Sequence, residues 1–441
     1  MLVMKFGGTS VGSADAIRSA ARIVVSAKSR KPVVVVSAVA GFTNTLLAIA
    51  KEKNPSVRIG MITPLRAKHK EIASSLGLKS TLLDPEFKEL TALAKRRHKI
   101  DKKLLDAYIS FGERLSAKLF AGQLSNFGVR AQAIAAYDLG MITDNNFGAA
   151  EPLETSYALI QKKLTAFDAV PVVTGFIGKT KKGEITTLGR GGSDYTAAII
   201  GAAVKAEAIQ IWKEVDGFMT TDPRLVPEAR VVPELAFEEA AELAYFGAKV
   251  LHPKTILPAM KAGVPVQILN TFQPEGGGTT IVANFAERKQ KSTSVEALTF
   301  KKGVIALHIY SPEFFDGSGL MAKIFKTFEK YATSVDLVTT SVASVSLTID
   351  NDNHLEKIVK ALSQLGDVVV ESKKAIVCAV GGSVEMAGVA GKMFTVLGDA
   401  SVAVEMISQA SSGVSITFVV AEDDAEKAVK TLHKQFIEGT L

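Results

Sequence analysis

The 441-residue sequence contains a single cysteine, Cys378. One cysteine cannot form a disulfide within the chain, and it excludes zinc sites built from several thiolates. We therefore expect a reducing compartment, the cytoplasm. The sequence also lacks any run of about 18 consecutive apolar residues, the length that a membrane-spanning helix needs. Because the first apolar run begins at Leu2, we expect neither a signal peptide nor a transit peptide.

A concentrated basic surface is also missing, although the formal net charge is +7. The main local excess of lysine and arginine is the segment 95–103 (KRRHKIDKK), which lies in a helical pattern with Leu93 and Leu104 as apolar companions. No aromatic residues are interleaved with it, so a solvated helix face is a better interpretation than a nucleic-acid surface. We expect small phosphorylated molecules as partners, and neither nucleic acid nor a membrane.

Apolar residues are plentiful, and their pattern predicts the fold class. The chain is long enough for two or three domains, and its 47% hydrophobic and 22% charged residues are typical of folded soluble proteins. Between Lys5 and Asn270, apolar runs without polar alternation are separated by helical patterns, which is typical of parallel strands covered on both faces. We predict an open α/β sheet that binds ligands beyond the carboxyl ends of its strands. Predicted strands are 33–37, 131–136, 170–174, 208–212 and 264–269, and predicted helices include 15–25, 101–123, 193–204 and 237–246.

The first ten residues contain a candidate phosphate site. Leu2–Phe6 is a short apolar strand with Lys5 near its carboxyl end, and Gly7 and Gly8 follow. An unpaired lysine is too costly inside an apolar core, but at a strand end beside glycines it can bind an anion together with backbone N–H groups and the start of the next helix. The spacing matches neither the Walker motif nor GxGxxG. An ordinary lysine at a strand edge, before a Gly-Gly turn, is the alternative.

The segment 186–196 (TTLGRGGSDYT) surrounds Arg190 with glycines just before a predicted helix. Ser193 and Asp194 are expected helix caps at this position, and that role alone would explain them. Capping does not require the arginine, however. A guanidinium at a helix start is suited to bidentate binding of a carboxylate, so we predict that Arg190 binds an anionic ligand.

Three other polar residues are candidates, each with a structural alternative. Gly112 inside a predicted helix costs up to about 1 kcal/mol relative to alanine, which indicates the close approach of another group. Glu113 beside it is either a carboxylate for an amine or simply an exposed acid. Thr43 follows the second strand and either caps a helix or faces a ligand. We interpret His252, which precedes a proline, as a turn or core histidine.

The C-terminal part contains an internal repeat. The glycine-rich segment 273–280 is the best candidate for a linker in front of it. The segments 335–338 and 345–349 recur as 404–407 and 414–418, both at an offset of 69 residues (Val335 to Val404, Val345 to Val414). Each copy has the pattern strand, helix, hairpin of two strands, helix. Two small α+β modules of this kind bind a ligand, a partner or each other.

Taken together, these segments resemble the aspartokinase family of the amino-acid kinases, followed by paired ACT modules. Five segments match in order, namely 5–11 (KFGGTSV), 111–114 (FGER), 189–194 (GRGGSD), 221–224 (TDPR) and 247–253 (GAKVLHP). The resemblance covers essentially the whole chain and implies a monofunctional enzyme, because no segment long enough for a homoserine dehydrogenase follows.

The resemblance also implies the architecture. We expect a three-layer αβα kinase domain with a mainly parallel sheet, followed by two ferredoxin-like ACT domains. The implied boundaries are 1–280 for the kinase domain, 303–372 for the first ACT domain, and 292–302 plus 373–441 for the second, into which the first is inserted. The ACT domains would assemble the chain into a homodimer or homotetramer.

The activity implied by the resemblance is ATP-dependent phosphorylation of the β-carboxylate of L-aspartate, the first step towards lysine, methionine and threonine. That carboxylate has a pKa of about 4 and needs no general base, so the enzyme must supply alignment and charge neutralisation. Lys5 and Asp194 would be catalytic, with Asp194 orienting Lys5 and Mg²⁺ bridging the phosphates without a predicted protein ligand. The implied ATP-binding residues are Lys5, Phe6, Gly7, Gly8, Lys213, Glu214, Met219, Arg224, Lys249 and Val250. The implied aspartate-binding residues are Thr43, Glu113, Arg190, Gly191, Gly192 and Ser193.

The sequence departs from the family pattern at several positions. Many relatives have Thr-Asp where this chain has Lys213-Glu214, and a tyrosine where it has Met219, so the adenine contacts are less defined than the phosphate contacts.

An amino-acid effector, lysine or threonine, is implied for the first ACT domain. Lysine-sensitive relatives often carry a glutamate where this chain has Val342, which weakens the case for lysine. The implied effector residues are Phe314, Gly317, Leu320, Met321, Ser334, Val335, Asp336, Thr340 and Ser341.

Two alternatives stay open at this point. Amino-acid kinases that act on glutamate, acetylglutamate or UMP share the fold but lack paired ACT modules after this set of motifs. An amino-acid sensor that has kept the kinase fold without its activity would share both. The presence of Lys5, Arg190 and Asp194 disfavours such a sensor.

Overall fold

The computed structural model describes residues 1–96, 100–248, 250–284, 295–311, 319–382, 388–410 and 413–440. These residues form two compact units. The first unit comprises Met1–Phe218, Pro233–Phe237 and Val250–Arg288, and the second comprises Met219–Val232, Glu238–Lys249 and Lys289–Leu441. The kinase and ACT domain boundaries given by the resemblance stay a prediction.

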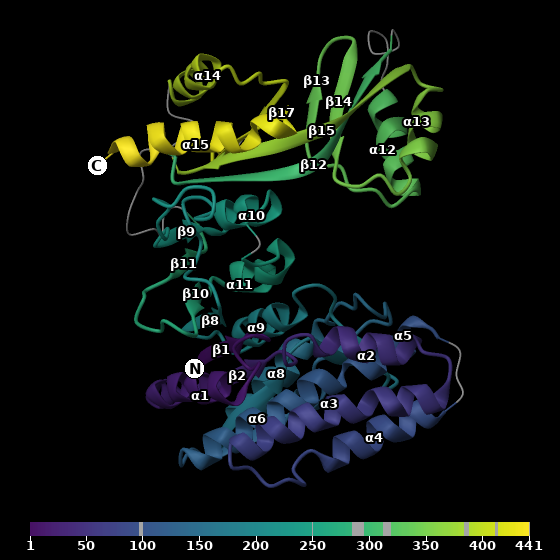
Figure 1. Ribbon diagram of the computed structural model, residues 1–441, viewed down its shortest axis with the longest axis vertical. Helices are drawn as coiled ribbons and strands as arrows, with labels where there is room; N and C mark the ends of the chain where they lie inside the picture. Colours follow the sequence, from purple (N-terminus) through teal and green to yellow (C-terminus); the bar gives the residue numbers. More distant parts are fainter. Residues whose placement is uncertain are drawn as a thin grey trace. The chain divides into compact units, whose positions relative to one another are not determined.

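An eight-stranded sheet forms the centre of the first unit (Figure 1). Its order is β3-β5-β2-β1-β8-β10-β11-β9, and the strands from β3 to β10 are parallel. β11 runs antiparallel to β10, and β9 pairs with β11 in parallel. The central strands β1 and β2 are buried at every residue, as expected for strands with helices on both faces. The bounds are β1 Leu2–Phe6, β2 Pro32–Val36, β3 Ala131–Ile134, β5 Val170–Thr174, β8 Ala208–Lys213, β9 Glu234–Ala236, β10 Val266–Asn270 and β11 Thr279–Val282.

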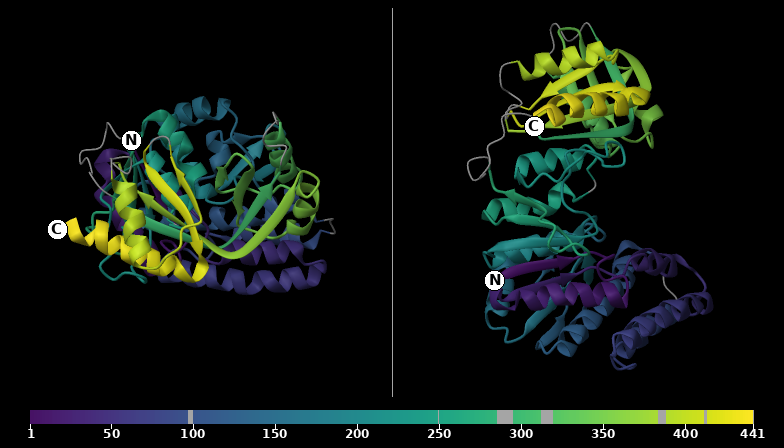
Figure 2. Two further views of the ribbon diagram at one scale, coloured as in Figure 1. Left: turned by 90° about the horizontal axis from the view of Figure 1, so that it is seen from above. Right: turned by 60° about the vertical axis from the view of Figure 1, so that its left-hand side comes forward.

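Helices lie on both faces of this sheet and make three layers (Figures 1 and 2). α6 packs on β2, β3 and β5 and contacts α1, whereas α9 packs on β1 and β8. A small sheet of β4, β6 and β7 belongs to the same unit. The predicted α/β class is therefore confirmed. The bounds are α1 Ala14–Ser26, α2 Phe42–Lys51, α3 Pro55–Ser75, α4 Asp84–Lys95, α5 Lys102–Ile109, α6 Phe111–Asn126, α7 Ala136–Leu139, α8 Thr155–Thr165, α9 Gly192–Ala203, α11 Leu257–Ala262, β4 Ile142–Thr143, β6 Ile177–Thr180 and β7 Ile185–Thr187.

Three predictions in this unit are wrong. The predicted helix 101–123 is two helices, because α5 ends at Ile109 and packs on α2 and β7, while α6 turns onto the main sheet. The predicted helical pattern through 95–103 is interrupted, since Arg96, Ile100 and Asp101 are not helical. The predicted linker 273–280 is the connection between β10 and β11, which pair as a hairpin. Glycine-rich segments form tight hairpin turns as readily as linkers.

The second unit contains a six-stranded antiparallel sheet in the order β13-β14-β12-β15-β17-β16. The long strands β12 and β15 pair along most of their length; β14 joins one half of β12, and β17 joins the other half of β15. Each copy of the repeat follows the predicted order, and α12 and α14 are offset by the predicted 69 residues (Leu320 to Val389). Each copy also has its own hydrophobic core. The bounds are α10 Phe237–Tyr245, β12 Ala297–Tyr310, α12 Leu320–Lys330, β13 Val338–Thr340, β14 Ser344–Ile349, α13 Leu355–Leu362, β15 Asp367–Val380, α14 Val389–Asp399, β16 Met406–Gln409, β17 Ser415–Ala421 and α15 Ala425–Phe436.

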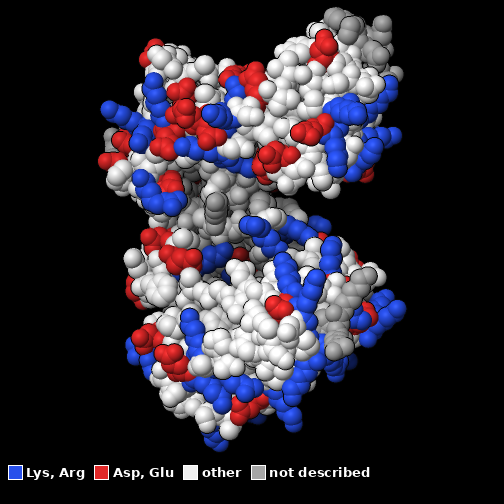
Figure 3. Space-filling model, turned by 45° about the vertical axis from the view of Figure 1, so that its right-hand side comes forward, with Lys and Arg blue, Asp and Glu red and all other residues white. Residues whose placement is uncertain are grey.

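Surface charge is mixed in sign on the face shown in Figure 3, where acidic and basic side chains are interspersed. Ion pairs between charged side chains include Arg30 with Glu207 at 2.8 Å and Lys103 with Glu184 at 2.7 Å. Within the described ranges, no helix has the length and apolar composition needed to cross a membrane.

We expect Gly112→Ala to lower the melting temperature of the protein. A Cβ atom on Gly112 in α6 would lie 2.6 Å from the Cβ atom of Ala38, and this clash should outweigh the helix preference for alanine of about 1 kcal/mol. Gly60 in α3 is the matched control, because nothing lies within 4 Å of its added Cβ atom and Gly60→Ala should raise the melting temperature. Thermal unfolding followed by circular dichroism compares the two variants. A stabilising Gly112→Ala would contradict the close contact.

Candidate active site

A cavity of about 380 Å³ lies beyond the carboxyl ends of the parallel strands of the first unit. Its walls come from the segments that follow β1, β2 and β5, from α6, and from the loop in front of α9. Residues from five separate parts of the sequence therefore meet at one edge of the sheet. The lining residues are Lys5, Gly8, Ser37, Ala38, Ala40, Gly41, Thr43, Glu113, Phe176, Gly189, Arg190, Gly191, Gly192, Ser193 and Asp194.

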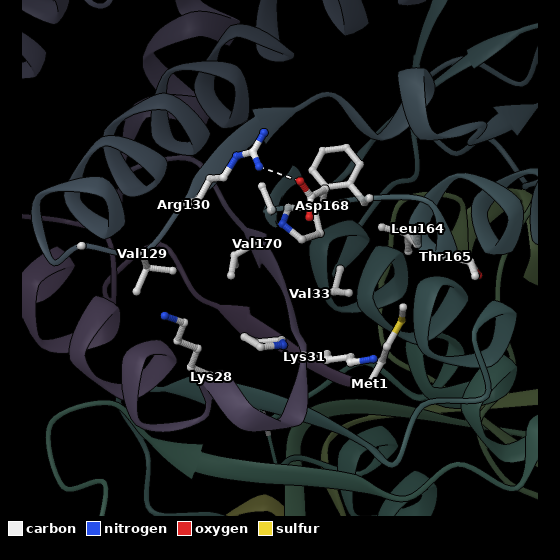
Figure 4. Close-up of a pocket in the computed structure, with 15 residues that line it drawn as sticks. Met1, Lys28, Lys31, Val33, Val129, Arg130, Leu164, Thr165, Asp168 and Val170 are labelled. Atoms are coloured by element: carbon white, nitrogen blue, oxygen red, sulfur yellow. Dashed lines mark hydrogen bonds and ion pairs between the residues drawn. The ribbon is translucent and has the colours of Figure 1, made fainter.

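A second cavity, of about 540 Å³, lies at the opposite end of the strands (Figure 4). It is lined by residues that precede β1, β2, β3 and β5, among them Lys28, Lys31 and Arg130, and Arg130 pairs with Asp168 at 2.6 Å. None of the predicted site residues is among its described lining residues. Because parallel α/β sheets bind ligands at the carboxyl ends of their strands, the smaller cavity is the candidate active site.

Lys5, Asp194 and Lys213 form a buried ion cluster in the wall of this site. The Nζ atom of Lys5 lies 2.6 Å from Oδ1 of Asp194, and the Nζ atom of Lys213 lies 2.9 Å from Oδ2. The two lysines meet because β1 and β8 are neighbours in register, with Phe6 opposite Trp212. Asp194 approaches from the first turn of α9. With both lysines protonated, the cluster has one positive charge in excess, which is suited to an anion.

The pKa values in the cluster follow from burial and mutual charge. Burial alone would raise the pKa of Asp194, but the charges of Lys5 and Lys213 outweigh it and lower that pKa to about 2. Burial lowers the pKa of Lys5, and the charge of Asp194 opposes this. Asp194 is therefore ionised at neutral pH and holds both ammonium groups in place.

The start of α9 is built by glycine. Gly191 has φ +69°, which an L side chain rarely adopts, and it stands at the N-cap of α9 without a side-chain cap hydrogen bond. The predicted capping role of Ser193 and Asp194 is therefore wrong, and Asp194 is used for the two lysines instead. The first residues of α9 line the cavity beside Arg190, and the positive dipole end of a helix suits anions.

Glu113 reaches the cavity from α6 and is 3% exposed, so the alternative of an exposed acid is wrong. One carboxylate oxygen accepts a hydrogen bond from the N–H of Ala38 at 3.1 Å, and the other is buried without a hydrogen-bond partner among the described residues. Burial raises the pKa of Glu113 to about 8, while the N–H of Ala38 and the charge of Lys5 act in the opposite direction. A buried, incompletely satisfied carboxylate is suited to bind a ligand ammonium group.

All the residues predicted to bind aspartate line the cavity, including Thr43 and Ser193. The residues predicted for ATP are less uniform. The Phe6 side chain is fully buried and stacks on Trp212, so only its backbone can face a ligand. The N–H of Gly7 already donates to the carbonyl of Trp212 at 3.0 Å. Gly8 lines the cavity.

The remaining ATP candidates divide between the units. Lys213 donates to the carbonyl of Val250 at 2.5 Å, and Glu214 accepts from the hydroxyl of Thr9 at 2.6 Å. Met219 and Arg224 belong to the second unit, where the exposed Arg224 pairs with Asp222 at 2.6 Å. Lys249 lies outside the described residues.

Sequence reasoning missed Phe176, which lines the cavity directly after β5. Its φ is +67°, and its N–H is bound by the hydroxyl of Thr196 at 2.9 Å. A Cβ atom on Gly192 would lie 2.5 Å from the Phe176 ring, which explains the glycine at that position. The search for residues that follow each parallel strand, which identified the other candidates, would have found Phe176 too.

His252 is exposed and stands just before a short 3-10 helix. Its prediction as a turn residue is therefore confirmed, and the alternative of a core histidine is wrong.

In the second unit, the predicted effector residues differ in how they are held. The side chain of Asp336 is 1% exposed; it accepts a hydrogen bond from the Tyr245 hydroxyl at 2.7 Å and pairs with Lys301 at 2.9 Å. Leu320 is buried in the hydrophobic core of its repeat copy. The exposed Ser341 exchanges a hydrogen bond with a neighbouring serine. Phe314 and Gly317 lie outside the described residues.

Comparison with known proteins agrees with this fold. A model of the amino acid kinase family matches residues 1–270, and a model of the ACT domain matches residues 377–436. The class is therefore that of an amino acid kinase with an ACT region. Aspartokinase 3, chloroplastic, from Arabidopsis thaliana is 38% identical over 461 residues, which cover 99% of this chain and 81% of the relative. Lysine-sensitive aspartokinase 3 from Escherichia coli (strain K12) is 35% identical, with 99% of both chains covered.

Solved structures agree as well. The crystal structure of E. coli aspartokinase III in complex with aspartate and ADP (R-state) has a TM-score of 0.81 at 34% identity and covers 98% of this chain and 99% of that one. The structure of Clostridium acetobutylicum aspartate kinase has a TM-score of 0.84 at 26% identity and covers 99% and 100%. The chain belongs to the aspartokinase family and is thus a phosphotransferase, which confirms the predicted family and enzyme class.

We expect Glu113→Gln to stabilise the protein increasingly as the pH rises. The pKa of Glu113 is about 8 in the folded protein and 4.5 ordinarily, so the folded form binds more protons between these values and ionisation lowers the free energy of unfolding across this range. The melting temperatures of variant and wild type should be similar near pH 4.5, and the variant's advantage should grow up to about pH 8. Glu71→Gln, at an exposed position on α3, is the control and should show no such trend. An advantage for Glu113→Gln that is independent of pH would contradict the raised pKa.

Proposed function

We propose that the chain transfers the γ-phosphoryl group of ATP to the β-carboxylate of L-aspartate in the cavity beside Arg190. One observation carries this proposal: Lys5 and Asp194 of the ion cluster, Arg190 and Glu113 all line the same cavity, and Lys213 pairs with Asp194 beside it. The cluster suits phosphate, the guanidinium suits a carboxylate and the buried carboxylate suits an ammonium group. An amino acid with a second carboxylate can use all three groups at once.

In this proposal aspartate is held at two points, and its β-carboxylate is left to react. Arg190 binds the α-carboxylate, Glu113 binds the ammonium group, and the hydroxyls of Thr43 and Ser193 complete the pocket. The β-carboxylate is ionised at neutral pH, because its pKa is about 4, so the attack needs no general base. Alignment of the carboxylate with the phosphorus atom is the main contribution.

The phosphate side of the reaction relies on fixed positive charge. Lys5 and Lys213 neutralise the phosphoryl oxygens as negative charge shifts from the attacking to the leaving oxygen. Asp194 keeps both ammonium groups in position before the substrates bind, so little reorganisation is needed during the reaction. The start of α9 adds N–H donors on the same side.

No group of three or more His, Cys, Asp or Glu side chains in the described ranges is placed to hold a metal ion, and Asp194 is already engaged by two lysines. We propose that Mg²⁺ would enter with the nucleotide and would add positive charge on the phosphate side.

The ligands named for relatives support these assignments. E. coli aspartokinase III has been crystallised with aspartate and ADP, and with lysine and aspartate. We propose that this chain binds ATP and L-aspartate, and that an amino-acid effector binds the first repeat copy.

The assembly into a homodimer or homotetramer and the cytoplasmic location stay predictions. The Arabidopsis relatives are chloroplastic by name. The buried Cys378 has a thiol whose pKa is raised by burial.

The activity is tested with purified protein, ATP, Mg²⁺ and aspartate, with hydroxylamine to trap the acyl phosphate. We expect hydroxamate from aspartate and not from glutamate, and we expect Lys5→Met to lower kcat by about 10²–10³-fold, as the loss of one electrostatic contact in a transition state does. Lys28→Met, in the cavity at the opposite end of the strands, is the matched control and should keep full activity. Circular dichroism verifies that both variants fold. An absence of hydroxamate from every substrate would favour the inactive sensor.

We expect Tyr245→Phe to make the enzyme more sensitive to its amino-acid effector. The Tyr245 hydroxyl donates to Asp336, and an effector ammonium group that binds this carboxylate must compete with it. A hydrogen bond to a charged group contributes about 1.5–3 kcal/mol, so the half-inhibitory concentration should fall about tenfold. Inhibition by lysine, threonine and methionine is measured singly and in pairs. Tyr310→Phe, at an exposed position on β12, is the control.

Two results would count against this part of the proposal. If none of these amino acids inhibits, the chain has no such effector. If inhibition is unchanged in Tyr245→Phe, the effector does not compete for Asp336.

A further inference from the structure

Asp106 is a buried carboxylate outside the predicted site. It lies on α5 and is 1% exposed. Its Oδ2 atom accepts hydrogen bonds from the N–H groups of Gly148 and Thr187, both at 2.9 Å, and its Oδ1 atom accepts one from the Thr187 hydroxyl at 2.8 Å. Every bond uses Asp106 as an acceptor, so one side chain ties together α5, the loop at Gly148 and the end of β7.

Thr187 is the last residue of β7 and stands three positions before Arg190. Its carbonyl accepts a hydrogen bond from the N–H of Ala150 at 2.9 Å, so the strand end is held from the loop side as well. The intervening Gly189 has φ +78° and packs against the Gly148 carbonyl, 3.4 Å from where a Cβ atom would lie. Asp106 thus binds the Gly148 loop and the end of β7, the two segments that fix the position of the backbone just before Arg190.

Arg190 depends on its backbone for its position. No hydrogen bond or ion pair joins its guanidinium to another of the described residues. Its segment also lies between two cavities, because Arg190, Gly189 and Phe176 line both the candidate active site and a neighbouring cavity of about 540 Å³ that Asp106 helps to line. A residue with open space on two sides cannot be positioned by packing alone.

We propose that Asp106 is a positioning residue: through Thr187 and Gly148 it fixes the backbone that presents Arg190 to the α-carboxylate of aspartate. This inference rests on the proposed function, because it needs Arg190 to bind aspartate. Asp106 does not touch either substrate in this proposal. Its loss should therefore weaken aspartate binding and leave ATP binding unchanged.

The chain offers variants that separate geometry from charge. In Asp106→Asn, the amide oxygen can accept from both N–H groups while the amide nitrogen donates to the Thr187 hydroxyl, so the three bonds persist without the charge. Asp106→Ala removes all three bonds. Thr187→Val removes only the bond from the hydroxyl and keeps the shape of the side chain.

The test is steady-state kinetics of the full-length chain with the hydroxylamine trap, with aspartate and ATP varied separately. For Asp106→Ala we expect the KM for aspartate to rise about tenfold or more, in line with the cost of a small misplacement, and the KM for ATP to stay within about twofold. Thr187→Val should raise the KM for aspartate by about threefold, and Asp106→Asn should stay close to wild type. Circular dichroism and melting temperatures are recorded for every variant.

Each outcome bears on the proposal. A folded Asp106→Ala with an unchanged KM for aspartate would overturn it, and so would an equal rise in both KM values. Impairment of Asp106→Asn to the level of Asp106→Ala would also overturn it, because charge rather than geometry would then matter. If Asp106→Ala does not fold, the two other variants test the proposal. An unchanged KM for aspartate in Thr187→Val, or a raised one in Asp106→Asn, would then overturn it. A wild type without aspartate turnover would instead overturn the proposed function, and this inference with it.

Discussion

The shared ion pair of Asp194 with Lys5 and Lys213 is the interaction on which the candidate site depends. A buried carboxylate is stable as an anion here only because two ammonium groups neutralise it, and removal of either partner from such a group usually costs several kcal/mol. The same contact joins β1, β8 and α9 at the centre of the sheet. The charges that hold these elements together are also the charges that we propose bind phosphate.

The second unit places one helix against both copies of the internal repeat. Tyr245 on α10 donates to Asp336 in the first copy, and Glu242 on the same helix accepts from the Ser415 hydroxyl in the second copy at 3.2 Å. Burial raises the pKa of Glu242, while the bond from Ser415 opposes this. Along the chain, α10 ends shortly before Val250, whose carbonyl binds Lys213. Tyr245, the last residue of α10, thus stands five positions before Val250 in the sequence.

Several errors of prediction have one physical origin. The expected helix 101–123 and the expected linker 273–280 both rested on local composition, yet packing decided the outcome: α5 and α6 turn onto different partners, and the glycines make a hairpin turn within the sheet. The capping interpretation of Ser193 and Asp194 failed for a similar reason. A side chain at a helix start caps the helix only if nothing in the tertiary structure competes for it, and here two lysines from neighbouring strands compete for Asp194.

The sequence by itself determined the family, the α/β class, the internal repeat and the set of residues at the strand ends, because these follow from apolar periodicity and from motifs that are local in the chain. Only the tertiary structure decided that Lys213 shares Asp194 with Lys5, and that Asp106 binds Gly148 and Thr187. It also decided that Glu113 is buried with one oxygen that has no hydrogen-bond partner among the described residues. Those contacts join residues tens to hundreds of positions apart. Strand order and register bring them together, and no local pattern in the sequence encodes either.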